Sequence, residues 1–77
     1  MERIVRQGML FDLYGDLLTE HQKEVFGSLV NEDLSLSEIA EEYGTSRQAV
    51  QDILKRTDRK LEEYESKLHL LEKKLSD

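Results

Sequence analysis

The pattern of two helices joined by a tight turn is present in LSEIAEEYGTSRQAVQDIL, from Leu36 to Leu54. This is the pattern of the helix-turn-helix, the motif that places a helix in the major groove of DNA. Ala40 leaves room where the two helices would cross, and Gly44 can adopt the positive φ that the turn requires. The residues expected to form the apolar contact between the helices are Ile39, Tyr43, Val50 and Ile53.

Capping residues mark the ends of both helices. Ser35 and Glu38 fit a capping box at the start of the first helix, which is expected to cover Leu36 to Tyr43. Ser46 is placed to cap the second helix through its hydroxyl, so this helix is expected to begin at Arg47. A plain helical hairpin without any role in DNA binding would show the same pattern.

The remaining sequence predicts further helices and no strands. Apolar residues at steps of three and four indicate a helix over about residues 2–18. Thr19 and Gln22 fit a second capping box, which begins a helix that ends near residue 30. The last helix meets no stop signal before Leu75. We therefore predict an all-α fold, a sigma region-four-like helix-turn-helix bundle with a long C-terminal helix.

The C-terminal part of the chain carries an apolar heptad pattern. Apolar residues recur there at alternating steps of three and four, which is typical of a coiled-coil seam. We therefore divide the chain into a helix-turn-helix domain, residues 1–57, and a helical extension, residues 58–77, that would act as a self-association stem. The predicted dimer interface consists of Leu61, Tyr64, Leu68, Leu71 and Leu75.

Charges beside the heptad pattern favour a parallel pair of helices. In a parallel homodimer Lys60 would face Glu65 of the second copy, and Lys67 would face Glu72. An antiparallel pair would oppose like charges instead. The same stripe could also fold against the first helix of its own chain or of a neighbouring chain.

The composition restricts the kind of protein. The chain has no Cys, which fits a reducing cytoplasm, and its N-terminus lacks a signal peptide. No apolar run approaches the length that spans a membrane. The net charge is −6, yet residues 47–60 carry a charge of +3. The second helix of the motif is therefore the one basic segment, and the acidic remainder is expected to make DNA binding strongly salt-dependent.

Polar residues at the start of this second helix are candidate nucleic-acid contacts. Arg47, Gln48 and Gln51 lie away from the apolar side, and Arg and Gln can form bidentate hydrogen bonds with guanine and adenine. Asp52 could accept a hydrogen bond from cytosine or pair with Arg56. An ordinary solvated helix face would have a similar composition. The cations expected to meet backbone phosphates are Lys55, Arg56 and Arg59.

No residue pattern indicates catalysis, a metal ion or a cofactor. His21 and His69 are isolated histidines, without a Cys or a second His at ligand spacing. Adjacent glutamates such as Glu41 and Glu42 point in different directions around a helix, so they do not form a carboxylate pair. The four glycines are too scattered for a phosphate-binding loop. We expect no enzymatic activity, no metal site and no cofactor.

Most of the chain resembles known bacterial proteins. The segment from Leu18 to Thr57 looks like the DNA-binding region-four domain of bacterial sigma factors. A more specific similarity, to the YlxM family, extends over about Leu10 to Lys74. The segments that carry it are LYGDLLTEHQKEVF, DLSLSEIAEEYGTSRQAVQDILKRT and LEEYESKLHLLEKK.

The resemblance implies an all-helical DNA-binding protein with a longer C-terminal region than this chain has. It also implies a regulatory or accessory role in the signal recognition particle pathway, because genes of the family neighbour the gene of the particle's protein. The turn Gly44-Thr45-Ser46 departs from the Gly-Val-Ser of many sigma factors and loses an apolar contact. Our first hypothesis is a homodimeric DNA-binding regulator. The second is an adaptor that binds the protein or RNA of the signal recognition particle, without sequence-specific DNA binding.

Overall fold

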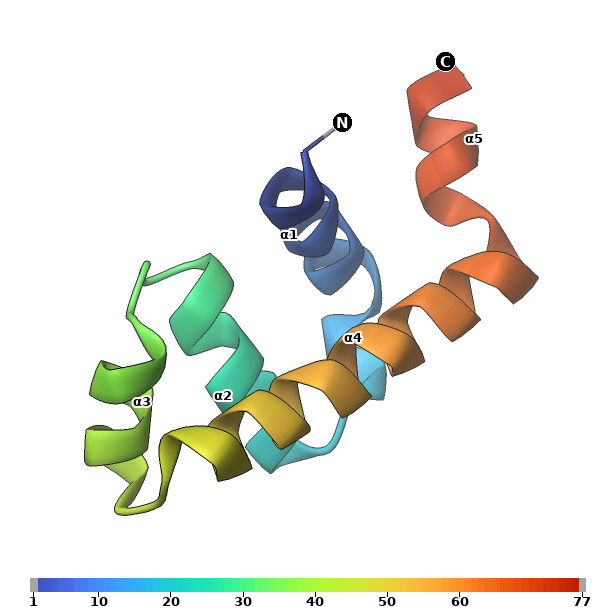
Figure 1. The fold of residues 1–77 in the computed structure, drawn as a ribbon. Helices are drawn as coiled ribbons and strands as arrows, with labels where there is room; N and C mark the ends of the chain where they lie inside the picture. The colour runs from blue at the N-terminus through green and yellow to red at the C-terminus, as the bar shows by residue number, and fades with distance from the viewer. Residues whose placement is uncertain (1, 77) are drawn as a thin grey trace.

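The computed structural model describes residues 2–76, and over that range it consists of helices without strands (Figure 1). The elements in chain order are α1 (Arg3–Tyr14), the 3-10 turn η1 (Gly15–Leu17), α2 (Glu20–Val30), α3 (Leu36–Tyr43), α4 (Arg47–Leu68) and α5 (Leu70–Ser76). The predicted all-α helix-turn-helix fold is confirmed. None of the helices within residues 2–76 has the length and apolar character needed to cross a membrane.

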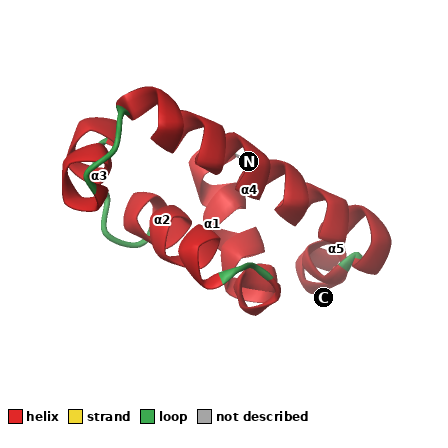
Figure 2. Ribbon diagram, turned by 90° about the horizontal axis from the view of Figure 1, so that it is seen from below, coloured by secondary structure: helices red, strands yellow, loops and turns green. Residues whose placement is uncertain are grey.

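The long helix α4 is the element on which the others pack. Helices α3, α2 and α1 each contact α4, and α5 turns back toward α1 (Figures 1 and 2). The described chain is elongated, with principal extents of 41 × 20 × 17 Å. The helix-turn-helix therefore lies at one end of the molecule, and the contact between α1 and α5 lies at the other.

Both capping boxes that the sequence predicts are present. The hydroxyl of Thr19 accepts a hydrogen bond from the amide of Gln22, and the Gln22 side chain accepts one from the amide of Thr19, both at 3.2 Å. Ser35 and Glu38 form the same reciprocal pair at 3.1 and 3.0 Å. These bonds satisfy amides that have no partner within their own helix, so α2 and α3 begin at fixed residues.

One apolar core extends from the helix-turn-helix to α5. Leu10 of α1 and Phe26 of α2 are fully buried, and the rings of Phe11 and Phe26 lie 5.5 Å apart. Leu61 of α4 and Leu71 of α5 are buried to the same extent. Each fully buried side chain of this size stabilises the fold by about 1.5–3 kcal/mol. Because residues of α1 and α5 share this core, the packing of the N-terminal and the C-terminal helix contributes to the same folded unit.

The prediction of one continuous C-terminal helix is wrong, because α4 ends at Leu68. His69 has a φ of 55°, in the left-handed region where helices commonly end. Helix α5 begins directly after His69 and folds back beside α1. The proposed boundary after residue 57 falls within α4, and the apolar core continues past it.

A buried carboxylate holds α5 in this position. Glu65 Oε1 accepts a hydrogen bond of 2.6 Å from the Tyr14 hydroxyl and one of 3.0 Å from the amide of Leu71. Glu65 Oε2 accepts one of 3.1 Å from the amide of Glu72. The Tyr14 oxygen in turn accepts a hydrogen bond of 3.1 Å from the amide of Leu70. We call Tyr14, Glu65 and these three amides the clasp. The two side chains accept the hydrogen bonds of amides that have no partner within α5 itself.

The clasp contains a carboxylate and a neutral phenol at neutral pH. Burial acts to raise the pKa of Glu65, but the hydrogen bonds from Tyr14 and from two amides outweigh burial and hold that pKa below its ordinary value. The pKa of Tyr14 is raised, first by burial and then by its hydrogen bond to Glu65. The two groups therefore keep the protonation states that their hydrogen bond requires.

Most of the predicted association stem packs within its own chain. Leu61 and Leu71 belong to the core, and the centre of the Tyr64 ring lies 5.9 Å from that of the Tyr14 ring of α1. The stripe thus folds against the first helix of its own chain, which was the alternative interpretation of the heptad pattern. Leu68 and Leu75 are exposed, at 52% and 56%. Self-association stays a prediction, and the part of the stripe still open to a second copy is this exposed pair.

Candidate nucleic-acid interface

The turn between α3 and α4 has the geometry that the sequence predicts. Gly44 has a φ of 64°, and the amide of Thr45 donates a hydrogen bond of 2.9 Å to the carbonyl of Ala40. Ser46 caps α4, because its hydroxyl accepts a hydrogen bond of 3.1 Å from the amide of Ala49. These bonds fix the angle at which α4 leaves the turn.

Apolar contacts between α3 and α4 determine which side of α4 faces outward. Ile39, Ala40 and Val50 are buried, and Tyr43 and Ile53 pack against them while half-buried. The predicted inner face of the motif is therefore confirmed. Because successive residues of a helix point about 100° apart, burial of Val50 turns its polar neighbours toward solvent.

The predicted base-contacting residues lie at the exposed beginning of α4. Arg47, Gln48 and Gln51 are all exposed, in the first two turns of the helix. The side-chain amide of Gln48 donates a hydrogen bond of 3.2 Å to Asp52 Oδ1. Asp52 therefore pairs with Gln48 and not with Arg56, the partner that the sequence suggested. Arg47 and Gln51 make no side-chain hydrogen bond within residues 2–76, so their polar ends are available to a ligand.

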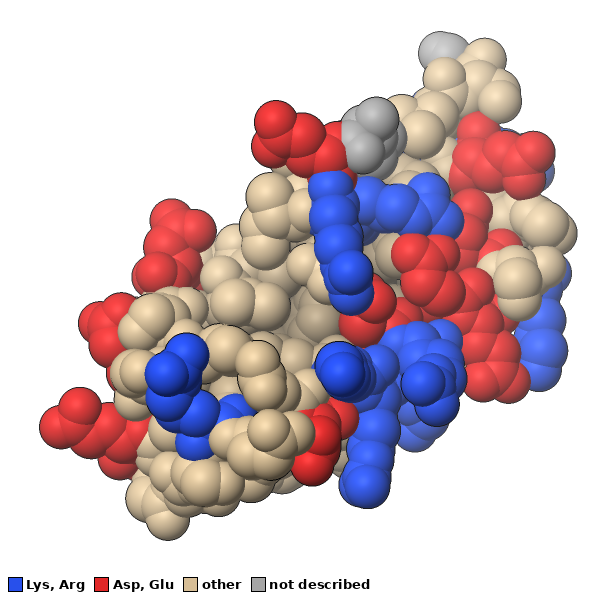
Figure 3. Space-filling view, in the orientation of Figure 1, with Lys and Arg blue, Asp and Glu red and all other residues tan. Residues whose placement is uncertain are grey.

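The predicted phosphate-contacting residues gather one turn further along. Lys55, Arg56 and Arg59 are exposed and, together with Asp52, line a shallow hollow of about 270 Å³. Figure 3 shows basic side chains gathered over the middle of α4, with acidic side chains on both sides of them. The structure thus brings the three cations onto one surface, in the middle of α4.

These cations differ from the arginines of α1 in having no acidic partner among residues 2–76. Arg6 forms a bidentate pair with Glu62, at 2.7 and 2.9 Å, and Arg3 pairs with Asp58 at 3.3 Å. Within residues 2–76, no ion pair involves the cations of α4 from its first residue to Arg59, which are Arg47, Lys55, Arg56 and Arg59. Their charge is therefore free to attract an anionic ligand.

The arginines of α1 also limit the acidic charge that faces this basic surface. The hydrogen bond from Arg6 holds the pKa of Glu62 below its ordinary value, although burial acts in the opposite direction. The same hydrogen bond raises the pKa of Arg6. Asp58 accepts hydrogen bonds from Arg3 and from Gln7. Asp58, within the basic segment, and Glu62, which follows it, are thus both paired with side chains of α1.

Two features of the structure were missed in the sequence. The ring of His21 meets the ring of Tyr43 edge-on at 5.9 Å, beside a hollow of about 240 Å³ next to the turn. The other feature is at the far end of α4, where His69 has two carboxylates as neighbours, Glu65 and Glu72, and these three residues could hold a metal ion. Their spacing of four and three residues is a signal in the sequence that a search for Cys and His alone overlooks.

The fold and the exposed start of α4 define the class of the protein, which is a helix-turn-helix protein. Residues 1–76 match the family UPF0122, described as "Putative helix-turn-helix protein, YlxM / p13 like", and the chain belongs to this family. The resemblance to the YlxM family that the sequence motifs indicated is therefore confirmed.

Curated relatives cover nearly all of the chain. It is 54% identical over 74 residues to the UPF0122 protein of Clostridium kluyveri, which covers 96% of this chain and 67% of the relative. It is 53% identical over 75 residues to the UPF0122 protein of Clostridium botulinum strain Alaska E43, covering 97% and 69%. For the UPF0122 protein of Bacillus thuringiensis strain Al Hakam the identity is 52% over 73 residues, covering 95% and 66%. The chain thus spans about two thirds of the length of these relatives.

Proposed function

We propose that this chain is a DNA-binding regulatory protein that inserts the start of α4 into the major groove and contacts DNA along α4 as far as Arg59. The observation that carries the proposal is the set of exposed cations that have no acidic partner within residues 2–76, on the second helix of the motif. The description of the family as helix-turn-helix proteins supports the same function.

The position of each side chain suggests its role in the complex. Arg47 and Gln51 lie in the first two turns of α4, the part of a recognition helix that meets base edges. Lys55, Arg56 and Arg59 lie further along and would contact phosphates, which position the helix without reading sequence. Gln48 is engaged by Asp52, so its contact with a base would use the oxygen or the second N–H of its amide.

The charge distribution predicts how binding depends on salt. Three phosphate contacts would give a slope of about −2.7 for the logarithm of affinity against the logarithm of salt concentration. The net charge of −6 repels DNA at longer range. It therefore opposes DNA binding at any surface other than the basic part of α4. Sequence-independent binding should therefore be weak.

A second function is favoured by the acidic side of the motif. Residues 32–46, which include α3, carry a charge of −5 directly beside the basic part of α4. In the adaptor function this mixed surface would bind a protein or an RNA of the signal recognition particle, in the cytoplasm. The same exposed residues of α4 would then contact a partner with mixed charge instead of a DNA groove.

Selection of duplexes from a random DNA pool, followed by fluorescence anisotropy on the selected duplex, tests the first function. The double variant Arg47→Ala, Gln51→Ala should weaken binding by about 30-fold or more, since each bidentate base contact is worth about 1–3 kcal/mol. The matched control, Lys73→Ala with Lys74→Ala on α5, removes two cations far from the motif and should change affinity by less than about threefold. Equal binding by both double variants would refute the proposed base contacts. Capture of particle protein or RNA, with no enriched duplex, would favour the adaptor.

A further inference from the structure

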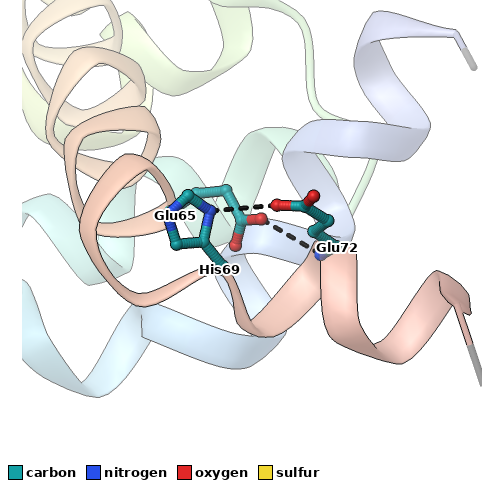
Figure 4. A group of neighbouring side chains, drawn as sticks. All are labelled: Glu65, His69 and Glu72. Carbon is teal, nitrogen blue, oxygen red and sulfur yellow. Dashed lines mark hydrogen bonds and ion pairs between the residues drawn. The ribbon is translucent and has the colours of Figure 1, made fainter.

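A histidine and two carboxylates converge where α4 turns into α5. Glu65 lies in the last turns of α4, His69 is the residue at the bend, and Glu72 lies in the first turn of α5 (Figure 4). One ligand atom from each side chain lies within 4.8 Å of the others. His69 Nδ1 and Glu72 Oε2 are 3.0 Å apart. Two ligands of one tetrahedral zinc ion are about 3.4 Å apart, so small rotations of these side chains would complete the geometry.

The clasp leaves Glu65 with capacity for one more partner. An ionised carboxylate has about four acceptor positions on its two oxygens. Three are used by Tyr14 and by the amides of Leu71 and Glu72, and two of these three donors meet Oε1. Glu65 Oε2 therefore has an acceptor position left, and Oε2 is the oxygen that a dashed line joins to Glu72 in Figure 4.

The charge around this group favours a divalent cation. The three side chains border a hollow of about 400 Å³ that is also lined by Arg6 and Glu62. Three carboxylates and one guanidinium give this hollow a formal charge of −2 when His69 is neutral. One divalent cation balances that charge, and the open hollow leaves room for water as a fourth ligand.

We propose that Glu65, His69 and Glu72 form a site for a divalent transition-metal ion at the junction of α4 and α5. Imidazole nitrogen with two carboxylate oxygens is a donor set that suits Zn²⁺. Mg²⁺ prefers oxygen ligands only and keeps most of its water, so it should bind weakly here. A bound ion would join the two helices and stabilise the bend. This inference is independent of DNA binding.

Titration of the full chain, without an affinity tag, with Zn²⁺ and with Mg²⁺ tests the proposal. Calorimetry should show one Zn²⁺ per chain, and saturation with Zn²⁺ should raise the Tm. The test variant is His69→Gly, because glycine accepts the positive φ of this position while the imidazole is lost. It should keep or raise the Tm without metal and should lower the Zn²⁺ affinity by at least about tenfold. Glu72→Gln should also lower the Zn²⁺ affinity.

His21→Ala is the matched control, because it removes the other histidine from the opposite end of the molecule. It should bind Zn²⁺ with unchanged stoichiometry and affinity. The proposal is overturned if His69→Gly binds Zn²⁺ as tightly as the unmodified chain, or if the His21→Ala variant is the one that loses binding. Equal affinities for Zn²⁺ and Mg²⁺ would also overturn it, since they would indicate unspecific attraction to exposed carboxylates.

Discussion

The hydroxyl of Tyr14 donates a hydrogen bond of 2.6 Å to the carboxylate of Glu65, a residue 51 positions further along the chain. This bond joins α1 to the last turns of α4. The same carboxylate accepts hydrogen bonds from the amides of Leu71 and Glu72. Tyr14 thus holds the group that pairs with the first amides of α5. A contact between distant residues therefore lies at the point where the long helix ends.

Loss of the Tyr14 hydroxyl should destabilise the fold and release α5. We expect Tyr14→Phe to lower the free energy of unfolding by about 1.5–3 kcal/mol, because a buried carboxylate loses a donor. Urea denaturation measures this loss, and hydrogen exchange at the amides of Leu70 and Leu71 should become faster. Tyr43→Phe is the control, since the Tyr43 hydroxyl makes no hydrogen bond within residues 2–76. Equal stability of the two variants would show that the clasp does not hold α5.

The turn of the motif should be sensitive to the loss of its glycine. Gly44→Ala should cost about 1–2 kcal/mol, because the left-handed conformation is unfavourable for any residue with a Cβ. Nothing lies within 4 Å of the position that this Cβ would take, so the φ of 64° is the sole reason for the effect. Gly8→Ala, in the middle of α1 and equally free of neighbours, should instead stabilise the chain by up to about 1 kcal/mol. Thermal unfolding of the two variants should therefore move in opposite directions.

The pair of Arg6 and Glu62 should make stability depend on pH. The hydrogen bond from Arg6 lowers the pKa of Glu62 in the folded chain below its ordinary value of 4.5. The pair's contribution is therefore complete above that ordinary value and is lost as the pH falls through the lowered pKa. Because both side chains are about 40% exposed, the contribution should not exceed about 1 kcal/mol. Glu62→Gln should be less stable than the unmodified chain at pH 7, and the difference should shrink as the pH falls through the lowered pKa of Glu62. A difference that does not change with pH would contradict this account.

Self-association can be tested at the residues of the stripe that remain exposed. Leu68→Glu with Leu75→Glu should abolish a dimer without lowering the Tm, because both side chains are more than half exposed. Leu61→Glu is unsuitable for this purpose, since it would bury a charge in the core and unfold the chain. Sedimentation equilibrium gives the mass of each variant. A dimer that survives the double substitution would show that the heptad stripe is not part of the interface.

Local signals in the sequence were sufficient for the motif and its ends. The capping boxes at Thr19 and Ser35, the turn at Gly44 and the cap at Ser46 depend on residues at most three positions apart. Such contacts can be inferred from spacing alone. The exposed position of the candidate DNA contacts follows from the same helical periodicity.

The bend at His69 could not be predicted in this way. No Gly or Pro marks it, and the heptad pattern continues through it because Leu61 and Leu71 face the core on both sides of the bend. Tyr14 contacts both sides of the bend, Glu65 and the amide of Leu70, from more than 50 positions away, and no local pattern shows such a contact. The pairing of Arg6 with Glu62 joins residues that are 56 positions apart. The sequence alone therefore could not show which charged residues are paired and which are left to meet a ligand.

The salt dependence of DNA binding tests the central claim, that α4 from Arg47 to Arg59 is the DNA-binding surface, most directly. Affinity for the selected duplex should be measured by anisotropy across a series of salt concentrations, for the unmodified chain and for the triple variant Lys55→Ala, Arg56→Ala, Arg59→Ala. If the three cations contact phosphates, the logarithmic slope should become shallower by about 2.7 in the triple variant. An unchanged slope would show that the DNA lies on another surface, and would contradict the account.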